Sequence, residues 1–249
     1  MNLRRLVFFG ALLGLWEAAA RAGFWPPYIF PSFSSVSRTL LAGLWDGSIV
    51  LGVVVSLRRI LLAYSFSAVV GTILGLALGR IKALEDTVGS LALGLQTLPS
   101  ICWLPLALLW FGLSEQAILF VTVMGAVLSI TIATEAGVRS LPPIYLRAGR
   151  TMGARGLALY RDVILPAAFP YMVSGLKQGW SFAWRSLMAG ELLYVNLGLG
   201  QLLMMGRELN DMGQVVAVML VIIGIGVVVD RGIFARIEQR IRSKWGLLA

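Results

Sequence analysis

The chain has 249 residues, of which 58% are hydrophobic and only 13% are charged, and its mean hydropathy is +0.85. Because a soluble domain carries about 25% charged residues, most of the exterior of this chain must face lipid, which excludes a cytosolic enzyme, a secreted domain and a disordered chain. The net charge of +9 is dispersed between long apolar runs, and the chain has no histidine and a single cysteine, Cys102; this composition argues against nucleic-acid binding, triad hydrolases, zinc enzymes and haem proteins.

Six stretches of the sequence are long and apolar enough to cross a membrane. A spanning helix needs about 20 apolar residues, because the hydrocarbon core is about 30 Å thick. The runs are continuous and do not alternate, which favours helices over barrel strands. We therefore expect an all-α membrane protein, a polytopic bundle of about six transmembrane helices that forms one domain over residues 1–249. The six spans are residues 3–20, 60–79, 88–111, 116–134, 168–194 and 213–230.

Basic residues are distributed unequally between the two sides of this bundle. With a cytoplasmic amino terminus, 14 of the 21 Lys and Arg residues fall in inside segments and 5 in outside segments. Because basic residues favour the cytoplasmic side, both termini are predicted to be cytoplasmic.

The first span has a second interpretation. Arg4 and Arg5 precede an apolar run that ends at the small residues 18–20, and this pattern resembles a secretory signal with its cleavage site. Glu17 directly before the small residues, and the five further spans, favour a retained helix. Sequencing the mature amino terminus separates the two interpretations.

The segment between the first two spans has the composition of an interfacial region. Residues 24–31 combine aromatics and prolines, which are typical of headgroup depth. Residues 36–45 have the pattern of a short amphipathic helix lying along the membrane. In the second span Gly71, Gly75 and Gly79 recur every four residues, which predicts a face for close helix packing.

The third span is interrupted by Pro99 and Pro105. Proline kinks a helix and frees a backbone carbonyl, which a membrane tolerates where neighbouring helices or a water-lined cavity satisfy the freed groups. We therefore expect this span inside the bundle, with Gln96 and Ser100 as candidate pathway residues. Composition alone leaves open whether the span lines a pathway or only packs.

The longest polar connection is the cytoplasmic loop of residues 137–166. Pro142 and Pro143 can begin a helix, and Gly153 and Gly156 interrupt it. Two short helices in such a loop predict a docking surface for a soluble partner, since ordering the loop costs conformational entropy that binding would offset.

The fifth span carries polar residues at helical spacing. Five of them recur at intervals of four, three, four and three, so they share one face, with Arg185 on its flank. A charge near the bilayer centre costs about 2.5–3.5 kcal/mol and must face protein or water. This stripe, a row of polar residues on one helix face with an aromatic residue and two cations, is what an anion pathway needs. The alternative is that its charges neutralise charges on neighbouring helices. Arg185 is the foremost substrate candidate, because a guanidinium holds a sulfonate or carboxylate through two hydrogen bonds. The five residues are Lys177, Ser181, Trp184, Met188 and Glu191.

At the cytoplasmic loop the sequence resembles the permease subunits of bacterial ABC importers. Their hallmark is a Glu-Ala-Ala triplet, three residues, a glycine, nine residues, and then an aliphatic residue, any residue, and Leu-Pro. Gly153 is followed at this spacing by Val163, Ile164, Leu165 and Pro166. The triplet position holds Arg147-Ala148-Gly149, so an arginine replaces the family's glutamate.

Further stretches are similar to the nitrate, sulfonate and taurine group of these permeases. The most specific is the segment 98–112, LPSICWLPLALLWFG, in the third span. The others are residues 31–36, residues 56–59, Trp184, residues 189–191 and residues 198–200.

The resemblance implies a type I ABC importer permease that acts as a homodimer in the bacterial inner membrane. It implies two cytoplasmic ATPases and an extracytoplasmic binding protein as partners. The chain itself contains no G-x-x-x-x-G-K-[ST] phosphate loop, so we expect no enzyme activity, no metal and no cofactor here, with ATP and Mg²⁺ bound by the ATPase. The resemblance places the coupling helix at residues 143–152. Its ATPase-coupling residues are Ile144, Tyr145, Leu146, Arg147, Ala148, Gly149, Gly153, Leu165 and Pro166.

The resemblance also implies a small anion as substrate, with an aliphatic sulfonate or taurine ahead of nitrate. A vitamin precursor or another small organic molecule is the alternative within the same machine. An ion-coupled secondary transporter is a further alternative, but it is expected to show internal repeats and a midplane carboxylate, and we find no clear repeat. ATP dependence of uptake separates the two classes.

Overall fold

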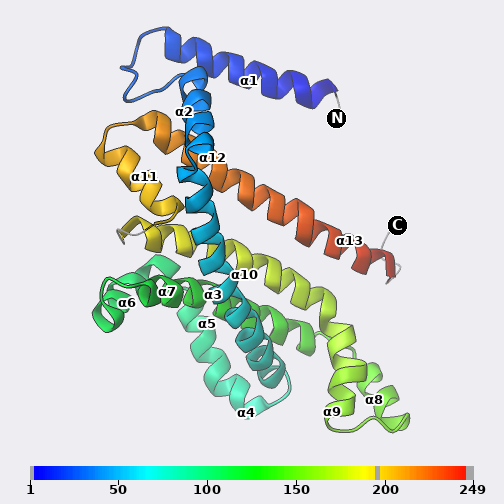
Figure 1. Cartoon of the computed structure of the whole chain (residues 1–249). Helices are drawn as coiled ribbons and strands as arrows, with labels where there is room; N and C mark the ends of the chain where they lie inside the picture. Colours follow the sequence, from blue (N-terminus) through cyan, green and yellow to red (C-terminus); the bar gives the residue numbers. More distant parts are fainter. Residues whose placement is uncertain (1–2, 194–196, 245–249) are drawn as a thin grey trace. The chain divides into compact units, whose positions relative to one another are not determined.

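The computed structural model describes residues 3–193 and 197–244, and every regular element in these ranges is helical (Figure 1). Helical turns of π type join α4 to α5 (Glu85–Gly89), α9 to α10 (Tyr160–Ile164) and α12 to α13 (Asp230–Phe234), and a 3₁₀ turn (Ser100–Trp103) precedes α6. The predicted end of the fifth span at residue 194 and both chain ends lie outside the described residues. The helices are α1 (Leu3–Arg21), α2 (Phe33–Trp45), α3 (Ser48–Leu78), α4 (Lys82–Leu84), α5 (Ser90–Gln96), α6 (Leu104–Phe111), α7 (Glu115–Arg139), α8 (Pro143–Thr151), α9 (Leu157–Leu159), α10 (Leu165–Leu193), α11 (Leu199–Glu208), α12 (Met212–Val229) and α13 (Ala235–Lys244).

Several of these helices have the length and apolar composition of membrane spans. Within the described residues they are α3, α7 and the continuous stretch Met212–Ile241, and the bent pair Lys82–Gln96 and Ser100–Phe111 adds a fourth if it counts as one span. Charged and other polar side chains interrupt the apolar runs of α1 and α10. The predicted all-α membrane bundle is confirmed, and the crossing of the membrane by α1 and α10 stays a prediction.

The chain forms two compact units. The first unit comprises Met1–Leu57 with Glu191–Ile225, and the second comprises Arg58–Gly190 with Gly226–Ala249. The prediction of one transmembrane domain over residues 1–249 stays a prediction.

In the first unit, a polar turn connects α1 to α2. Ser32 caps α2, because its Oγ accepts a hydrogen bond from the Ser35 backbone N–H at 3.2 Å. This cap starts the helix at Phe33, three residues before the predicted boundary. The Trp16 Nε1–H donates to the Pro31 carbonyl at 3.0 Å, and Glu17 Oε2 accepts from the Ser34 backbone N–H at 3.1 Å. These bonds fasten the end of α1 to the beginning of α2.

The helix that contains the second predicted span begins earlier than predicted, at Ser48 and not at residue 60. The Ser48 backbone N–H donates to Asp46 Oδ1 at 2.8 Å, which holds the pKa of the Asp46 carboxyl below its ordinary value. Arg58 and Arg59, expected at the start of the span, therefore lie inside α3. Within the second unit both arginines form ion pairs with the single carboxylate of Glu115, which offsets part of their charge.

The glycine face predicted in the second span is confirmed. A Cβ atom added at Gly71 would lie 2.9 Å from the Val127 carbonyl oxygen, and one at Gly75 would lie 2.5 Å from the Thr131 carbonyl oxygen. Gly79 approaches the end of α7 in the same way. The missing side chains let the backbone of α3 lie directly against α7.

Helix α7 also packs closely against α10. A Cβ atom at Gly179 would lie 2.6 Å from Ile130 Cγ1, and one at Gly137 would lie 2.6 Å from Tyr171 Cβ. The Tyr64 hydroxyl of α3 donates to the Leu176 carbonyl of α10 at 2.9 Å. The three helices α3, α7 and α10 thus form the centre of the second unit.

The third predicted span is broken and does not continue as one kinked helix. Helix α5 ends at Gln96, and the two parts meet at an angle of 103° around Pro99. Leu104 and Ala107 of α6 pack against Val121 of α7, but Leu109 on the other face is 80% exposed. The expectation that this span lies inside the bundle is wrong for the single chain, because only one face of α6 contacts its neighbour.

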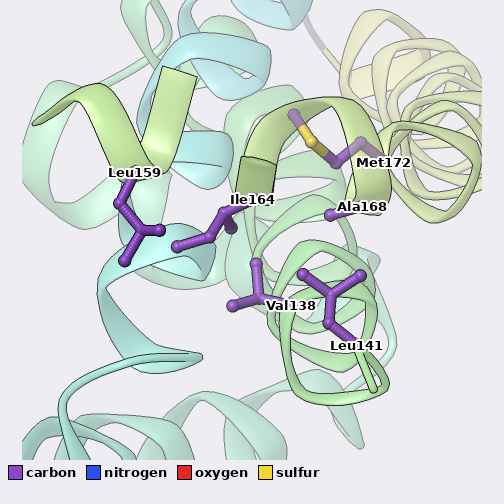
Figure 2. Close-up of a cluster of buried hydrophobic side chains, with 6 residues drawn as sticks. All are labelled: Val138, Leu141, Leu159, Ile164, Ala168 and Met172. Atoms are coloured by element: carbon purple, nitrogen blue, oxygen red, sulfur yellow. The ribbon is translucent and has the colours of Figure 1, made fainter. Parts of the chain in front are cut away.

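A buried apolar cluster supports the loop of residues 137–166 (Figure 2). Side chains from the end of α7 and the following turn meet side chains of α9, of the π-helical turn and of the beginning of α10. The loop is therefore a folded part of the second unit. The cluster consists of Val138, Leu141, Leu159, Ile164, Ala168 and Met172.

Candidate functional site

A helix, α8 (Pro143–Thr151), lies where the coupling helix is predicted at residues 143–152, and its coupling role stays a prediction. Gly153 has φ +88°, its N–H donates to the Arg150 carbonyl at 3.0 Å, and the Ala154 N–H donates to the Gly149 carbonyl at 2.9 Å. This pair of bonds is the Schellman arrangement, which needs a left-handed residue directly after the helix. The glycine of the family motif therefore ends α8 for a backbone reason.

The predicted coupling residues divide between two faces of α8. Ile144 is 67% exposed and Tyr145 is 48% exposed, and Arg147 and Ala148 are also exposed. Leu146, in contrast, packs against the cluster of Figure 2 and belongs to the fold of this chain. The outer face alone is open to a partner.

Gly149, the last residue of the triplet, is buried on the inner face. A Cβ atom there would lie 2.7 Å from Val163 Cγ2, so the glycine allows α8 to approach the following π-helical turn. That turn leads into Leu165, which is half-buried, and Pro166, which is exposed. The Leu-Pro end of the motif thus forms the first two residues of α10, and Pro166, which has no backbone N–H, donates no helical hydrogen bond to the π-helical turn before it.

Two exposed apolar residues beside α8 were missed by the sequence reasoning. Met152 is 87% exposed and Leu157 is 84% exposed. Met152 precedes Gly153 and Leu157 follows Gly156. Their positions beside the two glycines that interrupt the loop were the sequence signal that could have identified them.

A pocket of about 290 Å³ lies within the second unit, where the broken span meets α7 and α10. It brings together three of the predicted pathway residues: Gln96 at the end of α5, Ser100 at the start of the 3₁₀ turn, and Arg185 of α10. Ser129 of α7 also lines it and was missed, although it is a polar residue in an otherwise apolar run. The pocket combines polar groups with the apolar walls typical of a small-molecule site.

Arg185 supplies the positive charge of this pocket. Its Nε–H donates to the Ser181 carbonyl at 3.0 Å, and the guanidinium lies 4.8 Å from the centre of the Phe182 ring. Among the described residues, no carboxylate lies within ion-pair distance of Arg185. The terminal nitrogens of the guanidinium are therefore suited to an anion.

Two lining residues carry buried polar atoms whose hydrogen-bonding capacity is unused within the described part of the chain. They are Oε1 of Gln96 and Oγ of Ser129, and Ser129 is only 2% exposed. A buried polar atom without a partner is destabilising by about 1–3 kcal/mol. Both atoms are covered by neighbouring groups, so the open space of the pocket does not reach them.

Lys177 does not share the environment of Arg185. Its Nζ lies 3.2 Å from Asp230 Oδ1 and 3.4 Å from Glu238 Oε2, both in the second unit. This pairing matches the alternative in which the cation neutralises neighbouring helices. Lys177 does not line the pocket.

Glu191, like Lys177, is bonded to other residues of this chain, in this case within the first unit. The Ser56 hydroxyl donates to its carboxylate at 2.8 Å, and the Gly200 N–H donates to Oε2 at 3.0 Å. The Leu199 N–H in turn donates to Ser56 Oγ at 2.9 Å. The buried carboxylate therefore anchors the beginning of α11 to α3.

The other stripe residues do not line the pocket either. Trp184 is 7% exposed and stacks on Trp180 with ring centres 6.4 Å apart, and Met188 is buried. Ser181 is exposed, and its hydroxyl donates to the Lys177 carbonyl at 3.3 Å. The predicted common face therefore separates into buried packing residues and an exposed side.

Comparison with known proteins identifies the family. Residues 67–243 match the family described as binding-protein-dependent transport system inner membrane component. This match spans well over half of the chain. The chain belongs to this family.

Three curated relatives have related descriptions. A putative ABC transporter permease of Methanocaldococcus jannaschii is 33% identical over 83% of this chain and 79% of its own length. The nitrate import permease NrtB of Synechocystis is 28% identical over 71% of this chain and 64% of its own length. The taurine transport permease TauC of Escherichia coli is 27% identical over 94% of this chain and 86% of its own length. The resemblance to the nitrate, sulfonate and taurine group is confirmed.

Solved structures support the fold. An inward-facing structure of the MetNI methionine ABC transporter matches with a TM-score of 0.66 and 22% identity, covering 79% of this chain and 97% of that chain. The fold is that of the type I ABC importer permeases.

Proposed function

We propose that the chain is the membrane permease subunit of an ATP-driven importer in the bacterial inner membrane, with both termini in the cytoplasm. Two copies form the translocation pathway, two cytoplasmic ATPases bind and hydrolyse ATP with its Mg²⁺, and an extracytoplasmic binding protein delivers the substrate. Family membership supports the permease role. The permease performs no covalent chemistry and binds no cofactor.

The observation that carries the coupling role is the outer face of α8. Ile144, Tyr145 and Met152 expose apolar surface on a folded loop, at the place that the family motif marks. A large exposed apolar area on an ordered helix is typical of a protein interface. An ATPase groove that covers this face would transmit the closure of the nucleotide sites to α10, which follows the loop directly.

The substrate we propose is a small anion, with an aliphatic sulfonate or taurine ahead of nitrate. Arg185 lines the pocket and has no carboxylate within ion-pair distance among the described residues, which supports an anion over a neutral vitamin precursor, the alternative substrate. The taurine permease matches more of this chain than the nitrate permease does, 94% against 71%. Family membership disfavours an ion-coupled secondary transporter.

Replacement of Arg185 tests the pathway. We expect Arg185→Ala to lower uptake of radiolabelled taurine at least tenfold in proteoliposomes that hold the complete importer, because the anion loses a two-bond partner worth about 1.5–3 kcal/mol. Arg185→Lys should keep part of the activity, since it keeps the charge and loses the fork geometry.

Arg207, an exposed arginine of α11, provides the matched control, and Arg207→Ala should transport normally. Basal ATPase activity and subunit composition should stay unchanged in all three variants. Normal uptake by Arg185→Ala would discard the role of this pocket, and absence of taurine uptake by the unmodified importer would discard the taurine assignment.

A further inference from the structure

A charged segment directly follows the last apolar helix of the chain. Helix α12 has 18 residues, which rise about 27 Å and nearly match the hydrocarbon core of about 30 Å. The charged residues begin immediately after it, in the π-helical turn Asp230–Phe234 and in α13. In a bilayer that α12 crosses, these residues therefore lie at the depth of the lipid headgroups.

The two acidic side chains of residues 230–241 face α10. Lys177 Nζ lies 3.2 Å from Asp230 Oδ1 and 3.4 Å from Glu238 Oε2. Phe234 and Ile241 are buried and follow these carboxylates at helical spacing, so they share the inner face of the helix. The acidic groups are thus paired with a cation of this chain on the face that packs.

The opposite face of α13 is basic and exposed. Arg236 and Arg240 lie one helical turn apart, and both are exposed. The positions three and four residues away from each arginine hold no acidic residue, and within the described part of the chain no carboxylate lies at ion-pair distance from either. Two like charges at this spacing repel each other. An anion that contacts both guanidinium groups removes this repulsion.

Exposed apolar side chains precede the two arginines. Ile233, three residues before Arg236, is 52% exposed, and Val228 near the end of α12 is 68% exposed. The exposed surface therefore changes from apolar to cationic within a few helical turns. A phospholipid presents its acyl chains and its phosphate in the same order along the membrane normal, so the surface is complementary to such a molecule.

We propose that the outer face of α13 is a binding site for an anionic phospholipid, with Arg236 and Arg240 on its phosphate and Ile233 against its acyl chains. A guanidinium binds a phosphate through two parallel hydrogen bonds. Basic segments beside a membrane span attract anionic lipids. The site goes beyond the proposed function, because it does not depend on which substrate the importer carries.

The test measures lipid contact at this segment directly. The complete permease–ATPase complex is placed in phosphatidylcholine nanodiscs that contain a small share of a photoreactive lipid, either phosphatidylglycerol or phosphatidylcholine with the same reactive acyl chain. Mass spectrometry then measures the labelling of residues 230–241. We expect at least about tenfold more labelling by the phosphatidylglycerol analogue, because each basic residue strengthens binding about fivefold. Added salt should lower this labelling, since exposed charges are screened.

Variants assign the labelling to the two arginines. The double variant Arg236→Gln and Arg240→Gln should lower labelling by the phosphatidylglycerol analogue at least about tenfold. The double variant Arg236→Lys and Arg240→Lys should retain most of it, because it keeps both charges. Arg155→Gln provides the matched control, since Arg155 is an exposed arginine between α8 and α9, and its labelling should equal that of the unmodified complex.

Four outcomes would overturn the lipid site. They are equal labelling by the two analogues, unchanged labelling of the glutamine variant, competition by inorganic phosphate at constant ionic strength, and loss of the ATPase subunits from the glutamine variant. Competition by inorganic phosphate would assign the face to a soluble anion, and loss of the ATPase subunits would assign it to that partner. The proposed function stands or falls separately, because uptake by Arg185→Ala tests it.

Discussion

Gly153 has a backbone conformation that few other residues adopt, and this gives the family motif a testable energetic meaning. With φ at +88°, an added Cβ crowds the backbone even though no other atom lies within 4 Å of its position. We expect Gly153→Ala to destabilise the loop by about 1–2 kcal/mol. The measurement is the rate of limited proteolysis between α8 and α9, which should rise.

Gly224 in the middle of α12 provides the control for this substitution. It too has no atom within 4 Å of an added Cβ, but its φ is helical. Gly224→Ala should leave the proteolysis pattern unchanged. Equal proteolysis of the Gly153→Ala and unmodified proteins would show that the left-handed conformation is not what the loop requires.

Lys177 and Arg185 show how far periodicity alone predicts the environment of a residue. Both lie in α10, and their types and spacing assigned them to the same anion pathway. Lys177 is paired with Asp230 and Glu238, which are more than 50 residues away in sequence, whereas Arg185 lines the pocket. The sequence does not say which distant carboxylates approach a cation, because this depends on how the helices pack.

At the scale of elements, α8 offers a direct test of docking. We expect Ile144→Asp to release the ATPase subunits from the affinity-purified permease, because a charge in the middle of an apolar interface loses its hydration without a partner. The measurement is the ratio of ATPase to permease after purification, and it should fall by at least about tenfold.

The matched control is Leu209→Asp, because Leu209 is 67% exposed, like Ile144, but follows α11 in the first unit. It should keep the full complement of ATPase subunits. Retention of a complete complex by Ile144→Asp would contradict the docking role of α8.

The elements differ in how well the sequence predicts them. The glycines of α3 were correctly assigned to helix packing, because small residues every four positions have one main use in a membrane helix. The boundary of α3 and the 103° bend at Pro99 were not predicted. Proline indicates where a helix is interrupted, but the bend angle depends on the packing of α6 against α7.

At the scale of the whole molecule, import by the proposed complex requires energy from ATP hydrolysis by the partner ATPases. We expect proteoliposomes with the complete importer to accumulate taurine only when ATP is inside with the ATPases, and we expect a protonophore to have no effect. The permease alone should not accumulate it against a gradient, since it has no phosphate-binding loop. Accumulation driven by an ion gradient without ATP would establish the secondary-transporter alternative.

The sequence by itself determined that this protein lies in lipid, that it is an all-helical membrane protein, and to which family it belongs. The apolar composition requires a lipid environment, and the long apolar runs require a helical bundle. The spacing from Gly153 to Pro166 lies within one short segment, so it can be recognised as a motif in the sequence. Only the tertiary structure decided which polar residues share an environment. It separated Lys177 and Glu191 from Arg185 and joined Arg185 to Gln96 and Ser129. The physical reason is that pairing and burial depend on contacts between residues distant in the chain, which spacing along one helix does not encode.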